Sequence, residues 1–296
     1  MYKSHFGLRE PPFGITPDTS FFFACDAHQE ALNTLLVAVR NGEGFVKITG
    51  EVGTGKTLLC RKLLASLGDS FISAYIPNPY LEPRALLLAL AEELAVTLDK
   101  DVDQHRLFKA LNLALLNAAR NGRRVVLCLD EAQAMPLETL EALRLLTSLE
   151  TGKRKLLQVV LFGQPELDRN LGQESIRQLN QRITFQYCLG ALSAEEVDSY
   201  LDHRLGIAGY SGVRLFSRPA VKRLYRASAG VPRLVNILAH KAMMLAYGEG
   251  VREVGTRHVR AATADTPAAR GGRWRWWPTL ALIVSAGVGS AWVLFK

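Results

Sequence analysis

The chain has 296 residues, of which 48% are hydrophobic and 22% are charged, so it is not an intrinsically disordered protein. It is long enough for one large domain with a smaller one beside it. The formal net charge of +8 suits a nucleic acid or an anionic membrane face, and +5 of it lies in the last 45 residues.

The four cysteines lack the C-x-x-C spacing of a metal site. We expect buried thiols in a reducing compartment. The first residues, MYKSHFGLRE, lack the apolar stretch of a signal peptide, so the bulk of the chain is expected in the cytoplasm.

Residues 1–25 are rich in proline, glycine and aromatic side chains, which predicts an extended strap rather than a helix. A helix is predicted over 26–39, where apolar residues recur at helical spacing. The strap leads into the next strand, so it lies either over a nucleotide base or simply against the domain as packing.

The most informative stretch is FVKITGEVGTGKTLLC over residues 45–60. An apolar strand over 45–49 is followed by a match to G-x-x-x-x-G-K-[ST] and by a helix over 58–67, which is the context of a phosphate-binding loop. Lys56 is predicted to reach the β- and γ-phosphates of ATP, and Thr57 to ligate Mg²⁺. The remaining predicted nucleotide-binding residues of this stretch are Gly50, Glu51, Val52, Gly53, Thr54, Gly55 and Leu58.

A strand over 71–76, helices over 83–98 and 104–120 and an apolar strand over 125–129 follow. This alternation predicts a doubly wound α/β domain with a parallel sheet. The last of these strands ends in Asp130 and Glu131, the second half of a P-loop ATPase site. Asp130 is predicted to hold the Mg²⁺ shell, and Glu131 to orient and deprotonate the attacking water.

A helix over 137–149, a basic turn at 153–155 and a strand over 157–162 come next. Gln164 follows that strand and would lie beside Asp130 if the two strands are neighbours, where it could sense the γ-phosphate or the lytic water. Arg177 and Arg182 precede a strand over 183–187. We expect Arg182 to act as a finger on the nucleotide of a neighbouring subunit, with a solvated surface charge as the alternative.

From residue 191 the pattern is helical, and it predicts a small lid over 191–265. Ser193 and Glu196 have the spacing of a capping box. Arg233 follows Pro232 on the first turn of the third lid helix, where it could couple the lid to the state of the nucleotide.

The C-terminal stretch is predicted to anchor the chain in a membrane. Residues 266–277 form a basic linker rich in tryptophan, and 278–295 contain no charge. With the tryptophans, the segment is about long enough for a bilayer core of ~30 Å. The arginines before it place that side in the cytoplasm, so a single-pass anchor in the inner membrane is expected.

In combination, FGLREPPFGITPD, HQEAL, GEVGTGKT, LDEAQ, LLQVVLFGQPEL, LNQRI and GVPRLVN resemble AAA+ ATPases of the ExeA / general secretion pathway protein A group. The chain looks most like the shorter MSHA pilus biogenesis relative, MshM, because it stops at residue 296 without a peptidoglycan-binding region. The resemblance implies domain 26–190 as the AAA+ nucleotide-binding domain. It also implies Gln164 and Arg233 as sensors and Arg182 as a finger across a ring of identical subunits. Gln164 departs from the more usual asparagine or threonine.

The leading hypothesis is a membrane-anchored ATPase that uses ATP and Mg²⁺ to assist assembly of a type IV pilus or secretion apparatus; the assembly role comes from resemblance alone. The alternative is a DNA-binding AAA+ ATPase of the transposition or replication-initiation type, whose basic segments contact phosphates. A third possibility is a scaffold that binds ATP and scarcely hydrolyses it.

Overall fold

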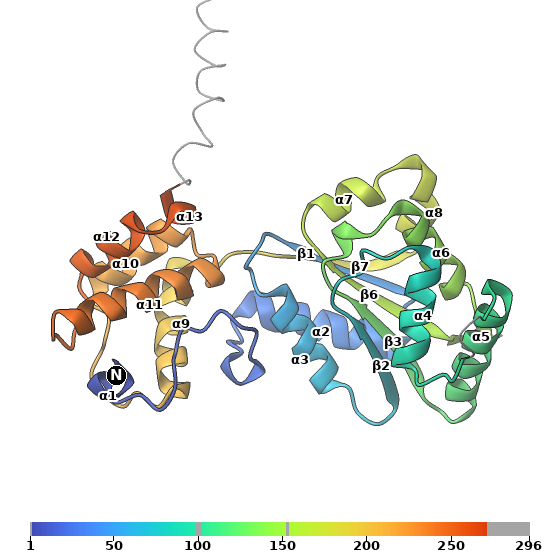
Figure 1. Cartoon of the computed structure of the whole chain (residues 1–296), viewed down its shortest axis with the longest axis horizontal. Coiled ribbons are helices and arrows are strands. Elements are labelled where there is room, and N and C mark those ends of the chain that lie inside the picture. Colours follow the sequence, from blue (N-terminus) through green and yellow to red (C-terminus); the bar gives the residue numbers. More distant parts are fainter. Residues whose placement is uncertain (1, 99–101, 152–153, 271–296) are drawn as a thin grey trace, which may run out of the picture. The chain divides into compact units, whose positions relative to one another are not determined.

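The computed structural model describes residues 2–98, 102–151 and 154–270 (Figure 1). The chain divides into two compact units. The α/β unit consists of Pro17–Gly190, and the helical unit of Met1–Thr16 with Ala191–Lys296. The sequence-based division kept residues 1–25 together as one strap, whereas here residues 1–16 belong to the helical unit and 17–25 to the α/β unit.

The α/β unit is built on a five-stranded sheet in the order β2-β3-β6-β1-β7. Every pair of neighbours in it is parallel, as predicted for a doubly wound domain. The strands are β1 (Phe45–Gly50), β2 (Phe71–Ile76), β3 (Arg124–Leu129), β6 (Leu157–Gly163) and β7 (Ile183–Leu189).

Helices cover both faces of this sheet. Successive residues of a strand point to opposite sides, so each strand contributes side chains to two cores. Along β3, Val126 and Cys128 join the core that contains residues of α2 and α3, whereas Val125 and Leu127 join the core that contains residues of α4, α5 and α6. The helices are α2 (Asp26–Asn41), α3 (Lys56–Ser66), α4 (Pro83–Glu93), α5 (Gln104–Arg120) and α6 (Leu137–Thr147).

Two local predictions in the α/β unit were wrong. The helix predicted to run to residue 98 ends at Glu93, because Ala95 adopts a left-handed backbone with φ of 52° and the Val96 N–H turns back to the Ala91 carbonyl at 2.8 Å. The last two residues of the predicted basic turn, Arg154 and Lys155, form the short strand β5 (Arg154–Lys155), which pairs antiparallel with β4 (Glu150–Thr151).

The α/β unit also contains short helical segments, one before β1 and the others between β3 and β7. They are η1 (Thr19–Phe21), η2 (Ala132–Ala134), α7 (Glu166–Leu171), η3 (Glu174–Ile176) and α8 (Arg177–Asn180).

The predicted capping box is confirmed at the start of helix α9 in the helical unit. Ser193 Oγ accepts from the Glu196 N–H at 3.1 Å, and the Glu196 carboxylate accepts from the Ser193 N–H at 2.7 Å. The helices are α9 (Ala194–Ile207), α10 (Arg218–Ser228), α11 (Pro232–Gly248), α12 (Thr256–Ala264) and α13 (Pro267–Arg270).

The first residues of the chain pack on this helical unit. The segment predicted to be wholly extended starts with a short helix, α1 (Tyr2–Phe6), since its prolines and glycines come only later. Arg204 of α9 then binds the Pro12 carbonyl through Nε at 2.5 Å. These contacts join the first residues of the chain to the helical unit.

The predicted membrane helix over 278–295 and most of the linker before it lie outside the described residues. Across residues 2–98, 102–151 and 154–270, none of the helices combines the length and the apolar character that a membrane span needs.

Gly230 provides a test of the helical unit. Its φ is +74°, and a Cβ there would lie 2.0 Å from the Leu192 carbonyl oxygen. We expect Gly230→Ala to lower the free energy of unfolding by about 2–4 kcal/mol, because the added methyl group meets backbone that cannot move away cheaply. Denaturant unfolding measures the change.

Gly206, inside α9, is the matched control, since nothing lies within 4 Å of a Cβ placed there. Gly206→Ala should stabilise the protein by about 0.5–1 kcal/mol. Equal unfolding midpoints for the two variants would contradict this description of the turn.

Candidate active site

The phosphate-binding loop connects β1 to α3, and its glycines are required by its shape. Gly53 and Gly55 have φ of +86° and +104°, in the left-handed region that other residues rarely adopt. A Cβ on Gly50 would lie 2.7 Å from the Leu189 carbonyl oxygen of the neighbouring strand. Helix α3 starts at Lys56, two residues before the predicted start, and no side chain caps its first N–H groups. Its N-terminus therefore offers backbone donors to an anion.

Lys56 is held at this loop and is only 5% exposed. Its Nζ donates to the carbonyl oxygens of Gly50 at 2.8 Å and Glu51 at 3.0 Å, which uses two of its three N–H groups. Burial lowers the pKa of Lys56, and the negative charges of Glu131, Asp130 and Glu51 oppose that shift. The ammonium thus lies in a little-hydrated position beside carboxylates.

Thr57 and Asp130 meet at the end of β3. The Thr57 hydroxyl donates to Asp130 Oδ2 at 2.6 Å, and the Glu131 N–H donates to Asp130 Oδ1 at 3.0 Å. Burial raises the pKa of Asp130, and the Thr57 hydrogen bond works against that shift.

A hydroxyl beside a carboxylate is a donor set that fits Mg²⁺, which prefers oxygen ligands. No cluster of three or more histidine, cysteine, aspartate or glutamate side chains suited to a metal occurs among the described residues. Thr57 and Asp130 supply two protein oxygen ligands, and phosphate oxygens would complete the coordination of the ion.

Glu131 has a strained backbone and two amide partners. Its φ is +54°, which is uncommon for a residue with a side chain. Its Oε2 accepts from Gln133 Nε2 at 2.6 Å and from Gln164 Nε2 at 3.0 Å. Burial alone would raise the pKa of Glu131, but these two hydrogen bonds and the charge of Lys56 outweigh it and lower the pKa. The carboxylate is thereby kept ionised and oriented.

Gln164 reaches Glu131 because β3 and β6 are neighbours in the sheet, with Leu129 opposite Leu161. The sequence analysis had made this position conditional on that neighbourhood. It assigned no role to Gln133, whose Oε1 accepts from the Gln164 N–H at 3.0 Å and so joins the two residues. Its only sequence signal was its place in LDEAQ.

The three predicted arginines lie in different surroundings. Arg182 donates from one terminal nitrogen to the Arg144 carbonyl at 3.0 Å and is half-buried, whereas Arg177 is exposed in α8. Arg233 is exposed on the first turn of α11, in the helical unit. Their roles toward a nucleotide stay predictions.

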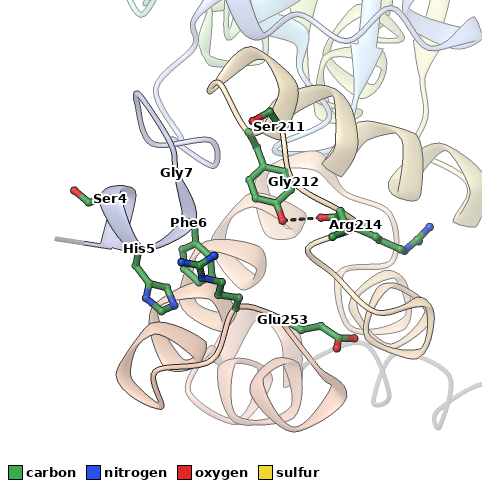
Figure 2. Close-up of a pocket in the computed structure, with 11 residues that line it drawn as sticks. Ser4, His5, Phe6, Gly7, Ser211, Gly212, Arg214 and Glu253 are labelled. Atoms are coloured by element: carbon green, nitrogen blue, oxygen red, sulfur yellow. Dashed lines mark hydrogen bonds between the residues drawn. The ribbon is translucent and has the colours of Figure 1, made fainter.

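A separate hollow of about 680 Å³ lies in the helical unit. Figure 2 shows residues that line it, among them His5, Arg214 and Glu253, and the bond from the Tyr210 hydroxyl to the Val213 carbonyl at 2.6 Å. None of the predicted site residues lines this hollow.

Comparison with known proteins also indicates a nucleotide-binding domain around the glycine-rich loop. Residues 39–171 match the family model described as AAA domain. The chain is 41% identical over 293 residues to general secretion pathway protein A of Aeromonas hydrophila, a match that covers 99% of this chain and 53% of the relative. It therefore spans about half the length of the curated relative it matches.

Solved structures share the fold at low identity. Cdc6p of Pyrobaculum aerophilum superimposes with a TM-score of 0.67 at 18% identity, covering 84% of this chain and 70% of that one. The ORC1 protein of Aeropyrum pernix, solved in complex with DNA, gives a TM-score of 0.62 at 21% identity, with 86% and 69% covered. The AAA-domain match and the 41% identical relative, together with the glycine-rich loop and the acids at the end of β3, identify the chain as an AAA+ protein similar to general secretion pathway protein A, whereas the solved structures show the shared fold alone.

Proposed function

We propose that this protein is a membrane-anchored ATPase that couples Mg²⁺-dependent ATP binding and hydrolysis to assembly of a type IV (MSHA-like) pilus or a type II secretion apparatus. The observation that carries the ATPase part is the convergence of Lys56, Thr57, Asp130 and Glu131 at one edge of the sheet. The assembly part is supported by the relative named for general secretion.

The residues divide the chemistry between them. The loop N–H groups and Lys56 would bind the phosphates, and Thr57 with Asp130 would hold the ion, which would supply positive charge beside the phosphoryl group to be transferred. Glu131 orients a water molecule and takes its proton, and Gln133 with Gln164 keeps the Glu131 carboxylate aimed and charged. Positioning and electrostatic stabilisation account for most of the catalysis expected of such a site.

Membrane attachment is supported by charge as well as by the apolar sequence near the C-terminus. The residues of the helical unit, counted to residue 296, include 17 lysines and arginines against 8 acids, whereas the α/β unit has 19 against 20. An anionic lipid surface attracts such a basic region. The likeness to Cdc6p and to ORC1, the latter solved in complex with DNA, is one of fold at under 25% identity and lends no support to DNA binding by this chain.

The first prediction concerns the proposed base. Glu131→Gln should reduce ATP turnover by at least about a hundredfold, because the amide cannot accept a proton from water. Binding should be retained, since Lys56 and the loop are unchanged. Phosphate release and equilibrium ATP binding measure the two effects. Full turnover in this variant would contradict the assignment, and negligible turnover in the unmodified protein would favour an ATP-binding scaffold.

The second prediction concerns Gln133. Gln133→Leu should lower kcat by about 10- to 100-fold with little change in ATP affinity, because Glu131 loses the closer of its two amide partners. Steady-state kinetics with a direct binding measurement separates the two quantities.

Gln104, exposed at the start of α5, provides the control. Gln104→Leu should behave like the unmodified protein. An unchanged kcat in Gln133→Leu would show that the amide does not position the carboxylate.

A further inference from the structure

A buried histidine touches the phosphate-binding loop from outside the motif. His28 lies on the first turn of α2 and is 6% exposed. Its Nε2 is 3.0 Å from the Thr54 carbonyl oxygen, and its Nδ1 is 2.8 Å from Cys25 Sγ. The Phe22 ring meets the imidazole edge-on, with centroids 6.1 Å apart. All of these residues belong to the α/β unit.

The partners assign the hydrogen positions on the neutral ring. A carbonyl oxygen only accepts, so Nε2 carries the hydrogen and donates to Thr54. Nδ1 is then the acceptor, and the Cys25 thiol donates to it. Cys25, the N-cap residue of α2, makes no side-chain bond to the helix N–H groups and instead selects the tautomer of His28.

The bond to Thr54 sets the direction of one peptide group in the loop. In a trans, planar peptide the C=O and the following N–H point in opposite directions. Holding the Thr54 carbonyl toward His28 therefore turns the Gly55 N–H the other way, away from the imidazole. The hydroxyl of Thr54 is fixed as well, because it donates to the Glu51 carbonyl at 2.9 Å.

The same contact accounts for the third glycine of the motif. A Cβ on Gly55 would lie 2.9 Å from His28 Nε2, so the imidazole occupies the space that a side chain would need. The absence of a side chain at Gly55 thus leaves room for the His28 ring of helix α2.

We propose that His28 is a positioning residue for phosphate binding: it anchors the Thr54–Gly55 peptide with its N–H aimed at the nucleotide, and Cys25 holds the ring in the tautomer that can do so. This inference rests on the proposed ATP binding. It adds a residue from α2 to a site that the sequence motifs place on the loop and on the ends of β3 and β6.

The test compares the ATP affinity of full-length variants in the presence of Mg²⁺. His28→Leu removes the donor and leaves a buried carbonyl unsatisfied, so we expect ATP to bind about tenfold more weakly. His28→Gln brings an amide nitrogen close to the position of Nε2 and should stay within about threefold of the unmodified protein. His28→Asn, one methylene shorter, should resemble His28→Leu.

Gln158→Leu is the matched control. Gln158 is 2% exposed and its Nε2 donates to the Val39 carbonyl at 2.9 Å, so it also joins a buried side chain to the backbone of α2, away from the loop. It should lower thermal stability without nucleotide to a similar degree and leave ATP affinity within about twofold. This separates positioning from a general loss of stability.

The outcomes distinguish a failure of the role proposed for His28 from a failure of the proposed ATP binding. If the unmodified protein binds ATP but His28→Leu binds equally well, or Gln158→Leu loses as much affinity, the role of His28 is refuted and the proposed function stands. If His28→Leu does not fold, equal affinities for His28→Gln and His28→Asn refute it in the same way. If the unmodified protein does not bind ATP at all, both fail.

Discussion

The site depends on one constraint, the pairing of β1 with a parallel strand on each edge. β1 is buried at every position between β6 and β7, so the loop that follows it must leave from the carboxyl edge of the sheet. The β3–β6 pairing brings the acids and Gln164 to that same edge. Ligands of open α/β sheets bind there because loops from several strands converge on it.

The charged groups at this edge of the sheet experience opposing effects on their pKa values. Burial lowers the pKa of Lys56 and raises that of Asp130. The charges of the neighbouring carboxylates oppose the shift of Lys56, and hydrogen bonds oppose the shift of Asp130. Glu131 is better compensated by its two amide partners, and its pKa is lowered. Such buried charges are costly unless they are paired, and a bound triphosphate with its cation would add further partners of both signs. We infer that nucleotide binding and the stability of this edge are coupled.

Much of the fold of the α/β unit and of the candidate site could be predicted from the sequence alone, because contiguous motifs encode them. The strand, glycine loop and helix around Lys56 and the apolar strand before Asp130 are local patterns with a known physical reason. The partners of those patterns could not be predicted. Gln133 and His28 act through bonds to residues fixed by tertiary packing, and the early end of α4 follows from one left-handed residue, Ala95.

Equilibrium ATP binding by two lysine variants tests the central claim most directly. Lys47 on β1 is 7% exposed and its Nζ pairs with Asp168 at 2.6 Å, so it matches Lys56 in burial and in having hydrogen-bond partners. The account predicts that Lys56→Ala loses ATP affinity by at least about a hundredfold, since a buried ammonium bonded to phosphate is removed, while Lys47→Ala binds almost as well as the unmodified protein. Unchanged affinity in Lys56→Ala, or an equal loss in both variants, would contradict it.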